Sequence, residues 1–134
     1  MSSTMNVTMN VTMMRTKIHR ATVTEADLTY EGSISICPDL IKASGLLINE
    51  QVDIYNCHNG ARFTTYVIKG RQGEICLNGA AARHVQKGDL VIIVAYCSLG
   101  FKDAQKHKAK AVFVDEKNRI KEKRKEARTK NKKS

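Results

Sequence analysis

The stretch QVDIYNCHNGARFTTYVIK, residues 51–69, decides the fold of this chain. Two runs rich in β-branched and aromatic residues, 51–57 and 62–69, flank the dipeptide Asn59-Gly60. This dipeptide is among the strongest short-range signals for a β-hairpin, because both residues tolerate the backbone conformation of a tight turn. The stretch therefore predicts two strands joined through that turn.

Further short strands are predicted on both sides of this hairpin. TKIHRATVT (16–24) is rich in β-branched residues, and a period of two places Lys17, His19 and Ala21 on one face. GEICLNG (73–79) predicts another short strand. LVIIVAYCSL (90–99) is the most apolar run, so we expect a central strand covered on both sides, and KAVFVDEKN (110–118) is expected to be the last strand, closing at a turn.

Two short helices are predicted between the strands. Pro38 suits the first turn of a helix and Gly45 suits its C-terminal stop. AAARHVQKGD (80–89) predicts a second helix of one to two turns that ends at Gly88. Many short strands with small helices between them indicate a compact β-barrel or an α+β fold.

The length of 134 residues allows a single domain with a modest core. Residues 1–14 repeat TMNV and offer no packing face, so we expect the folded domain to cover residues 15–118. The net charge is +10, of which residues 115–134 carry +6, with ten Lys/Arg against four Asp/Glu. Residues 119–134 are therefore predicted to form a basic tail, either a charged helix or disordered.

Composition excludes several classes of protein. No apolar run approaches the length of a membrane span, and the N-terminus lacks the apolar core of a signal peptide, which indicates a cytoplasmic protein. The four cysteines are spaced by 20, 19 and 21 residues, without the close pairs that zinc and redox sites need. We expect them to be reduced and mostly buried. We assign no metal site, and His58, His84 and His107 receive no metal or catalytic role because no ligand stands at a suitable spacing.

TYEGSISI, residues 29–36, poses the functional question. Gly32-Ser33 is a common turn dipeptide, and alone it predicts only a bend. The alternative is a peptide bond that the Ser33 hydroxyl attacks. The residues around it favour the second interpretation.

KIHRATVTEADLTYEGS (17–33), NGARFTTY (59–66) and LNGAAARHVQKGDLVIIVAY (77–96) follow one another in the order and spacing of a known family. In these motifs the chain resembles the pyruvoyl-dependent aspartate 1-decarboxylases, from about Arg15 to Asn118. The resemblance implies a double-psi β-barrel protomer within a homotetramer. It also implies a lyase that converts L-aspartate to β-alanine and CO2 for pantothenate and coenzyme A synthesis.

The family makes its cofactor from its own backbone, so the resemblance implies self-cleavage between Gly32 and Ser33. The products are a β chain, 1–32, and an α chain, 33–134. Ser33 becomes a covalent pyruvoyl group, which forms a Schiff base with the substrate amine, so neither a metal nor PLP is needed. Gly32 lacks a Cβ, which we expect to allow a strained, closely approached peptide bond. Thr65 is implied as the donor to the Gly32 carbonyl.

The resemblance also implies the substrate pocket. Tyr66 is the expected proton donor, and Arg62 is expected to hold a substrate carboxylate in a two-pronged contact, with Lys17 adding positive charge. His19 and Tyr30 are expected to support the site. The remaining substrate-binding residues implied are Thr65, Asn78, Gly79, Ala80 and Ala81.

One difficulty concerns the strand at 62–69. Strict alternation places Thr64 and Tyr66 on the face of Arg62 and places Thr65 on the other face. A bulge, a strand end or a neighbouring subunit would reconcile the three site residues of this strand.

Other functions remain as alternatives. A small basic β-barrel could bind nucleic acid through its tail, but 5% aromatic residues and no tryptophan offer no stacking platform, so we do not expect this. An uncleaved, inactive relative is the third alternative, and the intact set of site residues argues against it. Whether cleavage needs a separate maturation factor is left open.

Overall fold

The computed structural model describes residues 9–125, and in this range the chain is mainly β. The strands are β1 (Asn10–Thr22), β2 (Glu25–Asp27), β3 (Ser33–Ile36), β4 (Gln51–Asn56), β5 (Arg62–Lys69), β6 (Ile75–Asn78), β7 (Leu90–Gly100), β8 (Lys110–Val114) and β9 (Ile120–Lys125). Two α-helices, α1 (Pro38–Ser44) and α2 (Phe101–Lys106), and a 3-10 helix, η2 (Gly79–His84), lie between them.

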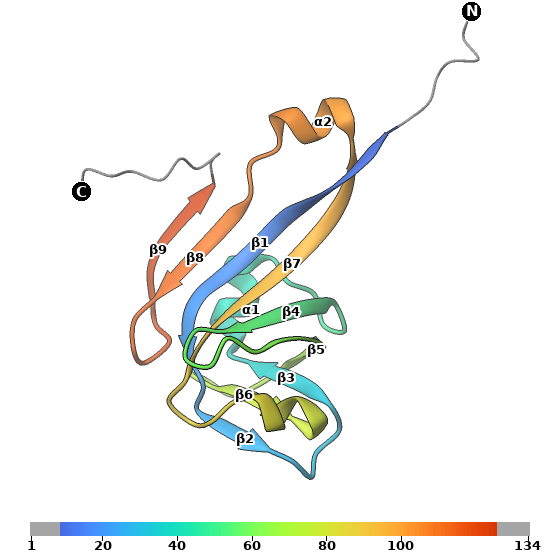
Figure 1. Ribbon diagram of the computed structural model, residues 1–134. Helices are drawn as coiled ribbons and strands as arrows, with labels where there is room; N and C mark the ends of the chain where they lie inside the picture. The colour runs from blue at the N-terminus through green and yellow to red at the C-terminus, as the bar shows by residue number, and fades with distance from the viewer. Residues whose placement is uncertain (1–8, 126–134) are drawn as a thin grey trace, which may run out of the picture.

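All nine strands belong to one sheet in the order β2-β6-β3-β5-β4-β7-β1-β8-β9. The long strands β1 and β7 form an antiparallel pair that projects toward α2, while β2, β3, β6 and η2 gather at the opposite end (Figure 1). This arrangement confirms the prediction of a mainly β chain with short helices. The double-psi β-barrel stays a prediction.

β3 and β6 lie entirely within the core of the sheet. Every residue of these two strands is buried, whereas β4 alternates between exposed and buried positions as a half-covered strand does. Each fully buried aliphatic side chain contributes about 1.5–3 kcal/mol relative to exposure. The largest of them are Ile18, Ile34, Ile36, Leu40, Ile54, Ile75, Leu77 and Ile93.

The hairpin and the first helix are confirmed. β4 and β5 pair antiparallel from Gln51↔Tyr66 to Tyr55↔Arg62, and Gly60 in the turn has φ +74°. Pro38 begins α1, and Gly45 ends it at φ +79°, donating its N–H to the Ile41 carbonyl. Since Cys37 alone separates β3 from α1, the helix is tied directly to the strand that begins at Ser33.

The predicted domain boundaries are wrong at both ends. β1 begins at Asn10, and residues 10–14 pair with β7, so the sheet includes part of the repeat that we excluded. Ile120–Lys125 forms β9 against β8, where a helix or disordered tail was expected, so β8 is not the last strand. The exposed edge of β8 supplies backbone partners that composition does not reveal, and lysines are common on such edge strands. The rest of the expected tail, 126–134, lies outside the described residues.

The expected face of β1 is also wrong. Lys17 and His19 are half-buried, but Ala21 is fully buried with Ile18 in the core. The register against β7 shifts between Ile18 and Ala21, and Arg20 adopts φ +60°. This bulge turns Ala21 to the opposite face from Lys17 and His19.

Two smaller expectations are corrected. The helix predicted to end at Gly88 is the 3-10 helix η2, which ends at His84 because buried Val85 returns to extended backbone. β7 is central, between β4 and β1, but it is covered only in its first half, since Tyr96 is 43% exposed. The four cysteines are free thiols, two of them buried, Cys57 exposed and Cys97 half-buried.

Candidate active site

Ser33 lies at the first position of β3, with only 1% of its surface exposed. Its Oγ donates a hydrogen bond to the Glu31 carbonyl at 2.9 Å. Gly32 forms the bend that precedes the strand. Ser33 therefore lies in a fully buried strand, whereas the dipeptide alone predicts an exposed turn.

Asn78 pairs with Ser33 across β6 and β3 and makes a second hydrogen bond to the serine hydroxyl. Its Nδ2 donates to the Oγ atoms of Ser33 and Ser35, at 3.0 Å each. Its Oδ1 accepts a hydrogen bond from the Cys76 thiol at 3.2 Å. Because the thiol fixes which end of the amide is the acceptor, the amide presents its donor end to Ser33.

Gly79 is the residue that permits the close approach at this site. It adopts φ +66°, and a Cβ there would lie 2.6 Å from the Gly32 nitrogen and 2.7 Å from its Cα. A Cβ on Gly32 would meet its nearest atom at 4.0 Å, and Gly32 has no left-handed φ. The structure thus has room for a Cβ at Gly32, and the steric need for glycine belongs to Gly79. That the missing Cβ of Gly32 allows a strained, closely approached bond stays a prediction.

The next residues of the NGAA stretch follow in η2. Ala81 is buried and Ala80 is exposed, so only one of the two methyl groups faces the interior. The backbone of this turn lies beside the Gly32-Ser33 bond, because Gly79 contacts Gly32.

Thr65 and Tyr66 lie in β5, directly before the residues that pair with β3. β5 runs parallel to β3 with Ile34 opposite Val67. Continued one and two residues backwards, this register aligns Tyr66 with Ser33 and Thr65 with Gly32. The β4–β5 register is unbroken over these residues, which excludes the bulge considered above. Thr65 and Tyr66 point to opposite faces of β5, yet this alignment would place Thr65 opposite Gly32 and Tyr66 opposite Ser33 in the same chain.

Arg62 lies at the far end of β5, four residues before Tyr66, which corresponds to roughly 13 Å of extended strand. Its guanidinium stacks on the Tyr55 ring at 3.9 Å. The Tyr55 hydroxyl is 2.6 Å from that of Tyr96. Burial and then this hydrogen bond raise the pKa of Tyr55 to about 12. The guanidinium is thus held over a neutral ring.

The aromatic support of Arg62 and the role of Cys76 were missed from sequence. The hairpin register through Asn59-Gly60 could have paired Tyr55 with Arg62. Cys76 gave no signal, because a single cysteine in an apolar strand is usually only a small hydrophobe.

Lys17 and His19 lie in β1, which is four strand steps from β3 in the sheet order. Four strand spacings amount to roughly 19 Å measured along the sheet. His19 packs against Phe113, with ring centroids 5.2 Å apart. β1 and β3 are therefore not neighbouring strands of the sheet.

Tyr30 is 55% exposed and lines a cavity of about 420 Å³ beside Ser35 and Asn78. The cavity also contains the carboxylates of Glu25, Asp27 and Glu74 and the cations of Lys69 and Arg71.

The histidines without an assigned role all have structural partners. His58 lies 3.6 Å from Asp89, His84 stacks on Phe63, and His107 Nε2 lies 2.7 Å from the Met14 carbonyl. Within residues 9–125, no group of three or more His, Cys, Asp or Glu side chains could hold a metal ion. In the same range, no helix is both long and apolar enough to cross a membrane.

Comparison with known proteins identifies the family. The aspartate decarboxylase family model matches residues 9–121. Aspartate 1-decarboxylase of Bdellovibrio bacteriovorus is 73% identical over 124 residues, which are 92% of this chain and all of that protein. The enzymes of the same name from Campylobacter concisus and Caulobacter vibrioides are 59% and 56% identical over 84% of this chain, and 97% and 98% of their own. The chain therefore belongs to the aspartate decarboxylase family.

Proposed function

We propose that this protein is an aspartate 1-decarboxylase, which converts L-aspartate to β-alanine and CO2 in the cytoplasm and supplies pantothenate and coenzyme A synthesis. The observation that carries the proposal is the 73% identity across the whole length of the Bdellovibrio aspartate 1-decarboxylase. The buried arrangement around Ser33 supports it independently, because a serine in a simple turn has no need of a fixed amide donor.

The proposal includes self-processing at Gly32-Ser33. Ser33 Oγ attacks the Gly32 carbonyl carbon, the C–N bond breaks, and the hydroxyl proton passes to the released nitrogen, which leaves an ester. Loss of the Ser33 Cα proton then breaks the Cβ–O bond and frees the Gly32 carboxylate, with dehydroalanine at the new N-terminus. Its imine tautomer takes up water and releases ammonia, which leaves a pyruvoyl group.

The neighbours of Ser33 support these steps. The hydroxyl donates to the Glu31 carbonyl, so it must turn away from that bond before it can attack. Asn78 Nδ2 lies 3.0 Å from the attacking oxygen and can orient its lone pairs. Thr65, opposite Gly32 in the continued β5–β3 register, is proposed as the donor that stabilises the oxyanion.

The residues present fit a pyruvoyl group at position 33. A carbonyl oxygen beside Asn78 would accept the bond that Ser33 Oγ accepts, and Gly79 leaves the backbone space clear. The group would supply an electron sink for the loss of the substrate carboxylate. Tyr66, aligned with Ser33 in the same register, is proposed to deliver a proton to the substrate α-carbon.

We extend the proposal to a homotetramer with sites shared between subunits. A substrate with two carboxylates needs cations, and Arg62, Lys17 and His19 are the candidates. Arg62 lies roughly 13 Å along β5 from Tyr66, and β1 lies four strands from β3. Cations supplied by a neighbouring subunit would complete a pocket formed by Ser33, Asn78 and the backbone of Gly79, Ala80 and Ala81.

The experiment that tests the proposal is the intact mass of the purified, incubated protein. We expect two fragments split between Gly32 and Ser33, the larger one lighter by one ammonia than its simple hydrolysis product. Ser33→Ala should remain full-length. Ser35→Ala is the matched control, because it removes a second buried hydroxyl bound to the same Asn78 amide, and it should still yield both fragments.

An assay of β-alanine formation from L-aspartate completes the test. Processed protein without this activity would contradict the decarboxylase proposal while leaving self-cleavage intact. A full-length species that cleaves only after incubation with host extract would assign the first step to a maturation factor. A species that stays full-length in both conditions would contradict self-processing.

A further inference from the structure

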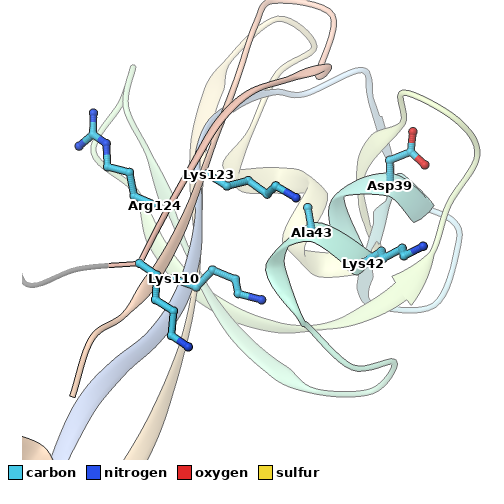
Figure 2. Close-up of a pocket in the computed structure, with 7 residues that line it drawn as sticks. Asp39, Lys42, Ala43, Lys110, Lys123 and Arg124 are labelled. Atoms are coloured by element: carbon cyan, nitrogen blue, oxygen red, sulfur yellow. The ribbon is translucent and has the colours of Figure 1, made fainter. Parts of the chain in front are cut away.

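A lysine-rich groove lies between α1 and the β8–β9 hairpin. Its first part is a cavity of about 460 Å³, lined by Lys42 and Asp39 of α1 and by Lys110, Lys123 and Lys125 of the strands. Lys110 and Lys123 extend from the strands toward the helix, while Arg124 points to the opposite side (Figure 2). β9 therefore presents alternate cations to this groove.

A second cavity of about 440 Å³ continues the first. The two share Lys110 and Lys125, and the second adds Lys106 and Lys108 from the segment around the end of α2. Lys110 Nζ lies 3.7 Å from the position that a Cβ on Gly45 would occupy, at the C-terminal end of α1. This lysine therefore stands where the two cavities meet.

The charge of the groove is poorly balanced. Two of the lining cations are neutralised by carboxylates, because Arg15 pairs with Glu50 and Arg124 pairs with Glu122. No ion pair within residues 9–125 involves the groove lysines, which are Lys42, Lys106, Lys108, Lys110, Lys123 and Lys125. Asp39 is the one carboxylate among the lining residues of both cavities, and it accepts a hydrogen bond from Gln72. Cations gathered in a concave surface reinforce one another's field and attract an anion.

The shape and lining indicate the kind of anion. Each cavity has the volume of a small-molecule site. Lysine binds phosphate as a compact point charge. The lining residues contain no phenylalanine, tyrosine or tryptophan on which a base could stack, which disfavours single-stranded nucleic acid. Several ammonium groups in a row match several linked phosphoryl groups better than one isolated charge.

We propose that this groove binds a polyphosphate anion with two or more linked phosphoryl groups, carried by a nucleotide or by an inorganic chain. The site is separate from the proposed active site, since no residue that lines either cavity also lines the cavity beside Asn78. The proposal does not depend on the decarboxylase activity.

The test is calorimetric titration of the full-length protein with inorganic tripolyphosphate, at low and at physiological salt. We expect one binding event per chain, weakened at least about tenfold in the triple variant Lys110→Gln, Lys123→Gln, Lys125→Gln. Lys123→Gln alone should give a smaller loss in the same direction. Asp39→Asn should strengthen binding, because it removes the carboxylate that repels the anion.

The matched control removes the same charge elsewhere, through Lys87→Gln, Lys102→Gln and Lys117→Gln, none of which lines the groove. An equal loss of affinity in this control would overturn the proposal, as would the absence of binding by the wild-type protein. Tighter binding of tripolyphosphate than of ATP would assign the inorganic chain, and tighter ATP binding a nucleotide; equal affinity would mean that the groove recognises the phosphoryl groups alone. A single-stranded oligonucleotide that binds more tightly than both, and only when the groove lysines are present, would replace the proposal with nucleic-acid binding.

Discussion

Two buried asparagines, each only 3% exposed, serve different regions of this sheet in different ways. The Asn118 amide bonds to backbone: its Oδ1 accepts from the Thr22 N–H at 2.7 Å, and its Nδ2 donates to the carbonyls of Thr22 and Gly73. The Asn78 amide bonds to side chains, the hydroxyls of Ser33 and Ser35 and the thiol of Cys76.

We propose that this difference separates a structural amide from a functional one. Backbone groups have few alternative partners once they are buried, so an amide that satisfies them fastens segments together. The Ser33 hydroxyl already donates its proton to the Glu31 carbonyl, so the amide that donates to its oxygen is not needed to satisfy it for folding alone. Asn118 should therefore govern stability, and Asn78 should govern the chemistry of Ser33.

Asn118→Ala should have the largest effect on stability in this comparison. It leaves the N–H and C=O of Thr22 and the C=O of Gly73 without their partner, and it places alanine at φ +61°. We expect a loss of about 3 kcal/mol in the free energy of unfolding, measured by urea denaturation of the Ser33→Ala form, which keeps the chain uncleaved.

Asn118→Gly separates the two causes, because glycine tolerates the positive φ but cannot make the hydrogen bonds. It should recover about 1 kcal/mol of the loss. Cleavage at Gly32-Ser33 in the folded fraction should continue at the wild-type rate for both variants. A specific block of cleavage would remove the distinction between the two asparagines.

Asn78→Ala should destabilise less but impair cleavage more. Since Ser33 keeps its bond to the Glu31 carbonyl, we expect a loss of about 2 kcal/mol, mainly from Ser35 and Cys76. The half-time of cleavage, followed by intact mass, should lengthen by at least about tenfold. If this variant cleaves normally and melts like Asn118→Ala, Asn78 is structural after all.

Sequence reasoning located the elements whose signals are local. The Asn59-Gly60 hairpin and the α1 helix between Pro38 and Gly45 follow from residues that fix their own backbone angles. The Gly32-Ser33 pair and Asn78 were found through motifs around them, and the structure brings them into contact. The turn expected at the end of residues 110–118 also exists.

The features that escaped prediction depend on partners distant in sequence. Arg20 carries no turn signal, yet it adopts φ +60° because β1 must follow β7 before and after the bulge. Ile120–Lys125 is highly charged and becomes a strand because β8 offers an unpaired edge. The contacts of Cys76 and the backbone bonds of Asn118 across 96 residues arise only in the assembled sheet.

Cys76→Ala should have a smaller effect than loss of the amide itself. It removes the donor that fixes the Asn78 amide, and because a cavity of one sulfur atom is small, we expect a loss of about 1 kcal/mol. Cleavage should slow by about twofold to threefold as the amide samples its flipped orientation. Cys76→Ser retains a donor and should restore the cleavage rate, and a serine variant as slow as the alanine variant would contradict the orienting role.

The smallest expected effect is a dependence of stability on pH at the Asn78 site. Of the two asparagine amides, only that of Asn78 contacts a titratable group, the Cys76 thiol. Burial, and then the carboxylates of Glu74, Glu25 and Asp27, raise the pKa of the Cys76 thiol from 9.0 to about 11. The unfolded chain therefore loses this proton from about pH 9, while the folded chain keeps it until about pH 11, so stability is lost as the pH rises between these values.

Melting temperatures of the wild type and Cys76→Ser should differ by a constant amount below pH 9. Above it, the wild type should fall further, by a few degrees at most. Tyr55, whose raised pKa acts in the same direction, and the other cysteines are present in both proteins and cancel in the difference. Parallel curves up to pH 11 would mean that the thiol ionises equally in both states, which would contradict the raised pKa of Cys76.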